Sequence, residues 1–183
     1  KNNSIEIYNK DALSLPIWKL GSGSREVIAN LPYNISTKIL INLLKNSSQF
    51  SKLTMMFQKE VANRIIAKPG SKPYSRLSVI TQLKTKTKIL FDIPDTAFFP
   101  KPKVQSSLVQ FIPYENEKHN FDFEKMEELT RFVFAKKRKM LRTIFKKEGG
   151  SSFLNSINVD PNIRPENLTL EEFCKLEFAL RKH

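Results

Sequence analysis

One short segment combines residue types that could bind and orient an amine. It reads Asn30-Leu31-Pro32-Tyr33 and directly follows an apolar run. The Asn30 side-chain carbonyl and a nearby backbone carbonyl could accept hydrogen bonds from a poorly nucleophilic amine, such as that of adenine, and orient its lone pair. Pro32 stiffens the loop and restricts Leu31, and the Tyr33 ring could stack on a base. From these four residues alone, an ordinary strand end with an X-Pro turn is the simpler interpretation.

A strongly basic stretch is the second candidate. Residues 129–147 contain eight lysines and arginines and no acidic residue. At about 100° per residue, the spacing predicts one helix with apolar side chains on one arc and most cations on the opposite arc. Six of the eight fall largely on the opposite arc, namely Lys136, Arg138, Lys139, Arg142, Lys146 and Lys147, while Lys137 lies nearer the apolar side. Such a surface favours contact with phosphate groups, and a solvated face with counterions is the alternative.

Composition narrows the class of protein. The 183 residues include 31 Lys and Arg against 18 Asp and Glu, a formal net charge of +13. This excess favours a polyanionic partner, nucleic acid first, although a lysine-rich proteome would also produce it. One cysteine excludes an internal disulfide framework, and two histidines leave little for a His-based metal site. No run approaches ~18 apolar residues and no signal peptide is visible, so we expect a cytoplasmic monomer that does not enter a membrane.

The elements that must position these residues alternate along the first two thirds of the chain. Strands are predicted at residues 5–8, 25–29, 53–57, 85–91 and 104–112, and helices at 38–44, 59–67 and 77–83, the first of them capped by Ser36 or Thr37. This order is typical of an α/β sheet with parallel members.

The last third of the chain is predicted to be helical. A polar stretch at residues 113–120 marks the boundary. Asp122 can cap a helix that starts at Phe123, and Thr169 can cap a last helix at residues 170–180. Gly149-Gly150 interrupts the region between them.

Several stretches together resemble one family. Residues 30–37 resemble the amine-binding motif of the ribosomal RNA adenine dimethyltransferases, which use S-adenosylmethionine. Residues 58–64, 69–78, 135–139 and 164–168 fit the same family, and residues 98–106 match its pattern F-x-P-x-P-x-V-x-S. The resemblance covers nearly the whole chain in order. Ser75 stands where the family often has Gly.

The resemblance implies a fold and an activity. The fold would be α/β, with a Rossmann-like class I methyltransferase sheet in residues 1–113, a linker at 114–120 and a small all-helical RNA-binding domain in 121–183. The activity would be dimethylation of the N6 amines of two adjacent adenines near the 3′ end of small-subunit rRNA, without a metal, during maturation of the pre-ribosomal small subunit. A large-subunit rRNA adenine methyltransferase of the antibiotic-resistance type, or a non-catalytic rRNA-binding assembly factor, stays open as an alternative.

The resemblance also assigns roles to residues. Asn30 and the Pro32 carbonyl would hold the target amine next to the methyl donor, in the segment that includes Leu31. Tyr33 and Phe98 would pack against the flipped adenine, with Phe99 as the fallback for Phe98. Asp11, followed by Ala12, would bind the adenine of the donor. The RNA-binding residues would be Lys136, Lys137, Arg138, Lys139, Arg142, Lys72 and Arg76.

The N-terminal end departs from the family. These enzymes begin with a strand and a G-x-G-type loop that carries the amino-acid half of the donor, whereas only ten residues precede Asp11 and none is Gly. The chain therefore resembles the family without its first third, as a piece of a longer protein or as a short relative. Two strands would be absent between the one ending at Asp11 and the one ending at Asn30, so we expect unpaired strand edges and a gap in the core. We expect these 183 residues alone to bind the donor weakly and to be inactive.

Overall fold

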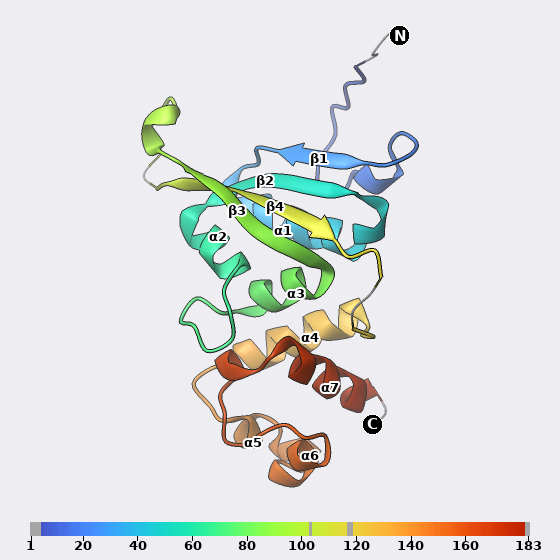
Figure 1. The fold of residues 1–183 in the computed structure, drawn as a ribbon, viewed down its shortest axis with the longest axis vertical. Helices are drawn as coiled ribbons and strands as arrows, with labels where there is room; N and C mark the ends of the chain where they lie inside the picture. Colours follow the sequence, from blue (N-terminus) through green and yellow to red (C-terminus); the bar gives the residue numbers. More distant parts are fainter. Residues whose placement is uncertain (1–4, 103, 117–118, 182–183) are drawn as a thin grey trace.

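A mixed four-stranded sheet lies at the centre of the described structure. The computed structural model describes residues 5–102, 104–116 and 119–181. The N-terminal four residues and part of the predicted linker, residues 117–118, lie outside it. The strands are β1 (Glu26–Ala29), β2 (Lys52–Gln58), β3 (Thr85–Ile93) and β4 (Ser106–Pro113), in the order β1-β2-β4-β3 (Figure 1). β1 is parallel to β2, and β4 is antiparallel to both β2 and β3.

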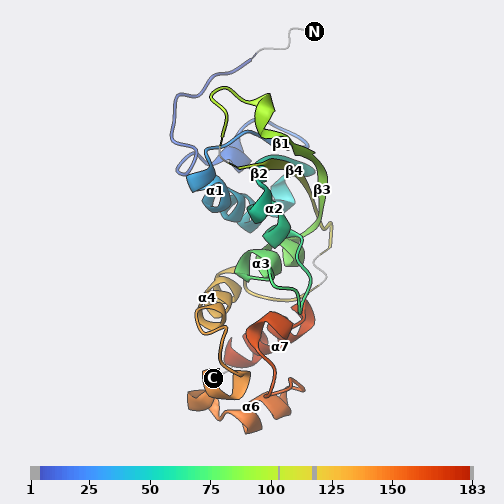
Figure 2. The same cartoon turned by 90° about the vertical axis from the view of Figure 1, so that its left-hand side faces the viewer.

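Three helices cover one face of this sheet. They are α1 (Tyr33–Lys45), α2 (Lys59–Ile65) and α3 (Arg76–Lys84), and Figure 2 shows α1 and α2 on the same side of the strands. Side chains alternate between the two faces of a strand, so Leu53 and Met55 of β2 are fully buried while Thr54 between them is not. On the opposite face Ile28 is 82% exposed. This half-covered α/β sheet agrees with the predicted fold class.

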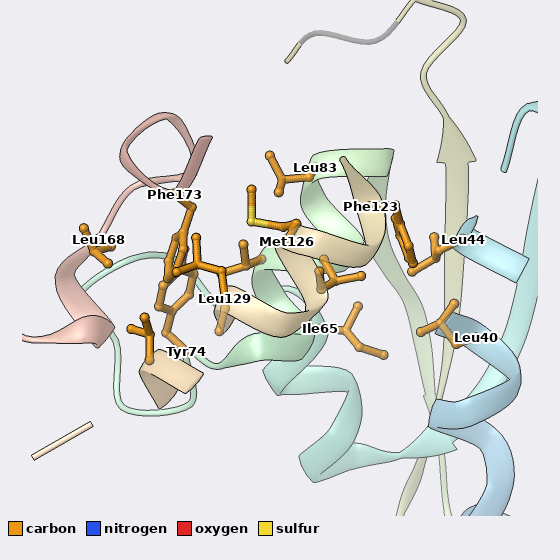
Figure 3. Close-up of a cluster of buried hydrophobic side chains, with 14 of the residues drawn as sticks. Leu40, Leu44, Ile65, Tyr74, Leu83, Phe123, Met126, Leu129, Leu168 and Phe173 are labelled. Atoms are coloured by element: carbon orange, nitrogen blue, oxygen red, sulfur yellow. The ribbon is translucent and has the colours of Figure 1, made fainter. Parts of the chain in front are cut away.

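The C-terminal helices extend the same core. They are α4 (Phe123–Phe134), α5 (Leu141–Ile144), α6 (Ser151–Ser156) and α7 (Leu170–Arg181). α4 packs on α3, and α7 packs on α4. Figure 3 shows the buried side chains running from Leu40 and Leu44 of α1, past Phe123 and Met126 of α4, to Phe173 of α7. A continuous apolar layer therefore fixes the helical region against the sheet.

The predicted caps of the C-terminal helices are confirmed. The Asp122 carboxylate accepts a hydrogen bond from the Lys125 backbone N–H at 2.9 Å. At the start of α7, the Thr169 hydroxyl accepts from the Glu172 N–H at 3.2 Å, and the Glu172 carboxylate accepts from the Thr169 N–H at 2.8 Å. These reciprocal bonds satisfy N–H groups that a helix start leaves without partners.

Two predictions near the N-terminus are wrong. Residues 5–8 form no strand, and Ile5 and Ile7 are 88% and 90% exposed, because an alternating segment becomes a strand only when a neighbouring strand pairs with it. Helix α1 begins at Tyr33, so Ser36 lies inside the helix and its hydroxyl donates to the Tyr33 carbonyl at 3.0 Å. Pro32 is the N-cap of this helix, with ψ of 133°, and its carbonyl accepts the first hydrogen bonds of the helix, so the first turn forms at Tyr33.

The basic stretch is not one helix, which corrects the prediction for residues 129–147. α4 ends at Phe134, residues 135–140 form an exposed turn, and α5 begins at Leu141. The Leu141 and Arg142 N–H groups donate to the carbonyls of Ile163 and Pro161, at 2.9 and 3.0 Å, so the chain bends to bury Leu141. In a continuous helix Lys136 and Lys139, three positions apart, would also be like-charged neighbours, which disfavours the helix. We call residues 136–139 the basic turn.

Ser75, which stands where the family often has Gly, has an ordinary backbone conformation. Ser75 has φ of −159°, an extended conformation open to any residue, and its N–H donates to the Ser78 hydroxyl at 3.0 Å at the start of α3. A glycine is therefore not required at this position. No helix of the described residues is long and apolar enough to cross a membrane.

The shared core predicts that alanine substitutions at two leucines differ in their effect on stability. Leu44→Ala is expected to lower the free energy of unfolding by about 2–5 kcal/mol because it leaves a cavity where the side chain is fully buried. Leu90→Ala removes the same atoms from a side chain that is 38% exposed, and a loss below about 1 kcal/mol is expected. Urea unfolding of both variants measures the difference, and equal losses would show that the α1 core is not packed as described.

Candidate functional site

The Asn30 segment lines a hollow at the end of β1. The hollow has a volume of about 210 Å³. It is lined by Asn30, Leu31, Pro32, Tyr33, Met56, Phe98, Phe99, Pro100 and Pro102. Two segments far apart in the sequence meet here because the neighbouring strands β2 and β4 pair Met56 with Leu108. The structure thus brings the predicted amine-binding residues and the predicted aromatic residue to one cavity.

A hydroxyl pair joins the two sides of this hollow. The Tyr33 hydroxyl lies 2.6 Å from the Ser106 hydroxyl, and Ser106 is completely buried at the start of β4. Tyr33 starts α1, whereas Ser106 pairs with Gln58 of β2 and Ile93 of β3. Ser106 is the last residue of the family pattern at residues 98–106, and no local sequence pattern predicts its partner. The bond holds the half-buried Tyr33 ring against the hollow.

The loop at residues 94–102 carries the other wall. The Phe98 N–H donates to the Asp95 carbonyl at 3.3 Å, and the Asp95 carboxylate pairs with Lys101 at 3.1 Å. Phe98 is half-buried, while Phe99 is fully exposed. These local contacts close the loop, with the Phe98 ring against the protein and the Phe99 ring in water.

Asp92 at the end of β3 fixes the strand that leads into this loop. Its carboxylate pairs with Lys59 at 2.7 Å and accepts from the Ser107 hydroxyl at 2.6 Å. The hydrogen bond from Lys59, followed by that from Ser107, holds the pKa of Asp92 below its ordinary value. These contacts connect α2, β3 and β4 next to the hollow.

The backbone carbonyls of the segment differ in their partners. The Pro32 carbonyl already accepts hydrogen bonds from the Ile35 and Ser36 N–H groups in the first turn of α1, at 3.2 and 3.1 Å. Among the described residues, neither the Leu31 carbonyl nor the Asn30 side chain makes a hydrogen bond. Leu31 and Asn30 therefore offer the acceptors with room for an incoming amine.

Asp11 and Ala12 lie apart from these residues. The Asp11 carboxylate accepts from the Leu13 N–H at 3.0 Å, and its carbonyl accepts from the Ser14 and Leu15 N–H groups at 3.1 and 2.9 Å. Among the described residues that line the hollow, neither Asp11 nor Ala12 is present. In this structure Asp11 shapes a local turn.

The size of the hollow limits what it can hold. Pockets that enclose a whole small molecule usually measure about 300–1,000 Å³, and this hollow is smaller, at about 210 Å³. It suits one aromatic base together with the reactive end of a methyl donor. The residues present fit that end of S-adenosylmethionine, and the described residues around the hollow provide no cradle for its amino-acid half.

A basic groove lies where the sheet region meets the helical region. It has a volume of about 610 Å³ and is lined by residues of α2, residues 66–67 and 72–75, and Lys137. Lys72 and Lys137, predicted separately to bind RNA, share this groove with Glu60 and Arg64, which form an ion pair with each other. Tyr74 also lines it, and its buried hydroxyl has no partner among the described residues, so burial raises its pKa.

The other predicted RNA-binding cations differ in their contacts. Arg76 forms an ion pair with Glu127 and ties α3 to α4. Lys136 lies 3.8 Å from the centre of the Phe132 ring, and the Arg142 guanidinium donates to the Asn162 side chain at 2.6 Å. Arg138 and Lys139 are exposed on the basic turn and have no ion pair among the described residues. Arg76 thus has a structural partner, whereas the basic turn projects charge into water.

The fold and the site define an α/β protein with a base-sized hollow at the carboxyl end of a parallel strand and a basic surface beyond it. The model of the family "Ribosomal RNA adenine dimethylase" matches residues 1–182, and the chain belongs to this family. The predicted family resemblance is therefore confirmed.

Individual relatives agree with this assignment. The chain is 40% identical over 172 residues to ribosomal RNA small subunit methyltransferase A of Gluconobacter oxydans, covering 94% of this chain and 57% of that protein. It is 44% identical over 172 residues to the protein of the same name from Wolbachia sp. subsp. Drosophila simulans, covering 93% and 63%. The chain thus spans roughly three fifths of the length of these two relatives.

Two solved structures share the fold. A dimethyladenosine transferase from Plasmodium falciparum superposes with a TM-score of 0.81 at 27% identity, covering 98% of this chain and 74% of that one. The 23S rRNA methyltransferase ErmE superposes with a TM-score of 0.66 at 18% identity, covering 96% and 72%, and this match shows the fold alone.

The hydroxyl pair beside the hollow gives a prediction about stability. Tyr33→Phe should lower the free energy of unfolding by about 1–3 kcal/mol because it leaves the buried Ser106 hydroxyl without this partner. Ser106→Ala combined with Tyr33→Phe should cost less than the sum of the two single changes. Tyr8→Phe, at an exposed tyrosine, is the control and should change stability by less than about 0.5 kcal/mol. Additive single effects in chemical denaturation would show that the two hydroxyls are not coupled.

Proposed function

We propose that the protein dimethylates the N6 amines of two adjacent adenines near the 3′ end of small-subunit rRNA, with S-adenosylmethionine as methyl donor, during maturation of the small ribosomal subunit. The observation that carries the proposal is the meeting of Asn30 and Phe98 at one base-sized hollow, in a chain that belongs to the rRNA adenine dimethylase family. The names of the relatives support the substrate class.

The chain's own residues would orient the amine. An adenine must leave its stack to enter a pocket of this kind. In the hollow, the Asn30 side-chain carbonyl and the Leu31 carbonyl would accept the two amine hydrogens. We prefer Leu31 to Pro32 as the second acceptor because the Pro32 oxygen already serves the first turn of α1. Two acceptors at fixed positions favour the nitrogen geometry needed for attack and lower the entropic cost of reaction.

Aromatic side chains would hold the base. Phe98 and Tyr33 line the hollow from its two sides, and stacking on such rings favours an unstacked base over its return to the RNA. S-adenosylmethionine supplies an electrophilic methyl group when bound. Asn30 and Pro32 would lie next to its reactive end, and Asp11, followed by Ala12, would hold its adenine.

The rest of the chain would hold the RNA. We propose residues 1–113 as the catalytic part, 114–120 as the linker and 121–183 as the helical RNA-binding part. The groove with Lys72 and the exposed basic turn, which includes Lys136 and Lys137, would contact phosphates, with Arg142 beside them. The contribution of Arg76 would be indirect, because its ion pair with Glu127 joins the two parts.

Replacement of Asn30 tests the proposed function. Asn30→Ala, in the protein at its native length, should slow methyl transfer to small-subunit rRNA by about 10²–10³-fold, because a preorganised acceptor is lost, and should leave RNA affinity unchanged. Asn34→Ala is the matched control, since Asn34 is exposed and does not line the hollow. Transfer is measured with a radiolabelled methyl group.

Three results would point away from this assignment. No methyl transfer by the native-length protein would favour a non-catalytic assembly factor. Methylation of large-subunit rRNA instead would favour the other enzymatic alternative. Full transfer by Asn30→Ala would exclude the proposed role of the hollow.

Charge reversal in the basic turn tests the RNA surface. Arg138→Glu with Lys139→Glu should weaken RNA binding and flatten the slope of log Kd against log salt concentration by about 1–2 units, because fewer counterions are released. Lys86→Glu with Lys88→Glu reverses two exposed lysines of β3 and controls for the change in net charge. Equal slopes for both double variants would remove the basic turn from the RNA surface.

A further inference from the structure

The aromatic ring beside Phe98 is fully exposed. Phe99 is 103% exposed, more than any other large apolar side chain among the described residues, yet it lines the same hollow as Asn30 and Phe98. A single exposed apolar side chain is common on protein surfaces. Phe99 differs from such residues because it lies at the lip of a base-sized hollow.

The hollow has no space for a second base. Its volume is about 210 Å³, below the range of pockets that take a whole ligand of drug size. When one base of an RNA strand lies inside, the nucleotides on either side must lie outside, over the lip. Phe99 is the aromatic residue that the structure places there, since Phe98 and Tyr33 are half-buried on the inner walls.

The loop holds this ring in position without burying it. Pro100 restricts the backbone of Phe99, and the ion pair between Asp95 and Lys101 closes the loop around both residues at 3.1 Å. The Phe98 N–H bond to the Asp95 carbonyl adds a turn just before the ring. Because these contacts and Pro100 restrict the backbone on both sides of Phe99, stacking a base on its ring would lose less conformational freedom than stacking on an unrestrained loop.

We propose that Phe99 is a stacking platform for the nucleotide next to the target adenine, and that it favours a purine at that position. The inference rests on the proposed function and extends it from the target base to its neighbour. Base stacking on an aromatic ring does not read hydrogen-bonding edges, so its preference follows stacking strength, which is greater for the larger purine rings. Phe99 would act as a positioning residue, and it would hold the second of two adjacent adenines at the lip while the first occupies the hollow.

A binding experiment without methyl donor tests the proposal. The whole chain is titrated with fluorescently labelled RNA oligonucleotides in which the neighbour of the target adenine is adenine, uridine or an abasic residue. Phe99→Ala should raise Kd at least about fivefold for the adenine neighbour and leave Kd unchanged for the abasic one. The wild-type preference for adenine over uridine should disappear in Phe99→Ala and persist in Phe99→Trp. Phe178→Ala, at another exposed phenylalanine, is the control.

The outcomes separate this inference from the proposed function. An unchanged Kd for Phe99→Ala with the adenine neighbour, or an equal rise with the abasic neighbour, would overturn the platform. Because Phe99 is fully exposed, its truncation leaves no internal cavity, and an unchanged Tm confirms that folding is intact. Failure of the proposed function would appear instead as absent methyl transfer by the native-length wild-type protein, a readout that this titration does not use.

Discussion

The bond between the Tyr33 and Ser106 hydroxyls is the contact on which the geometry of the site depends. Two chain segments must meet at the hollow, and each is anchored elsewhere: the Asn30 segment follows β1, and the loop at residues 94–102 connects β3 to β4. The hydroxyl pair lies where the start of α1 reaches the start of β4. Since Ser106 is buried and Tyr33 is half-buried, this polar contact is partly shielded from water, and it ties the start of α1 to the start of β4.

The hollow and the groove that Lys72 and Lys137 line differ in size and in position. A hollow of about 210 Å³ accommodates a base, whereas the cations lie along the groove and on the turn that follows α4. Figure 1 shows the sheet at one end of the long axis and α5 and α6 at the other. The RNA proposed as substrate would therefore have to reach from the hollow to the basic turn.

The junction between the sheet region and the C-terminal helical region is held by apolar packing and by one ion pair. Met126 and Leu129 of α4 are buried in the same core as Leu83 of α3, and the ion pair between Arg76 and Glu127 crosses the same junction. Apolar packing supplies the stability of this junction. The partly buried ion pair between Arg76 and Glu127 adds a contact that depends on the relative orientation of α3 and α4. The positions of the basic turn and the hollow are thereby fixed relative to each other.

The sequence alone determined what depends on neighbours in the chain. Residue type and spacing predicted strands near β2 and β3, the caps at Asp122 and Thr169 were visible from residue type, and the family pattern predicted that Asn30 and Phe98 belong to one site. Only the tertiary structure decided which segments met. Residues 5–8 alternate like a strand but pair with no strand among the described residues. Arg76 pairs with Glu127, 51 positions away, and residues 129–147 bend where Leu141 is buried. Local patterns record the preference of each segment, whereas pairing, burial and long-range hydrogen bonds depend on residues that are distant in sequence.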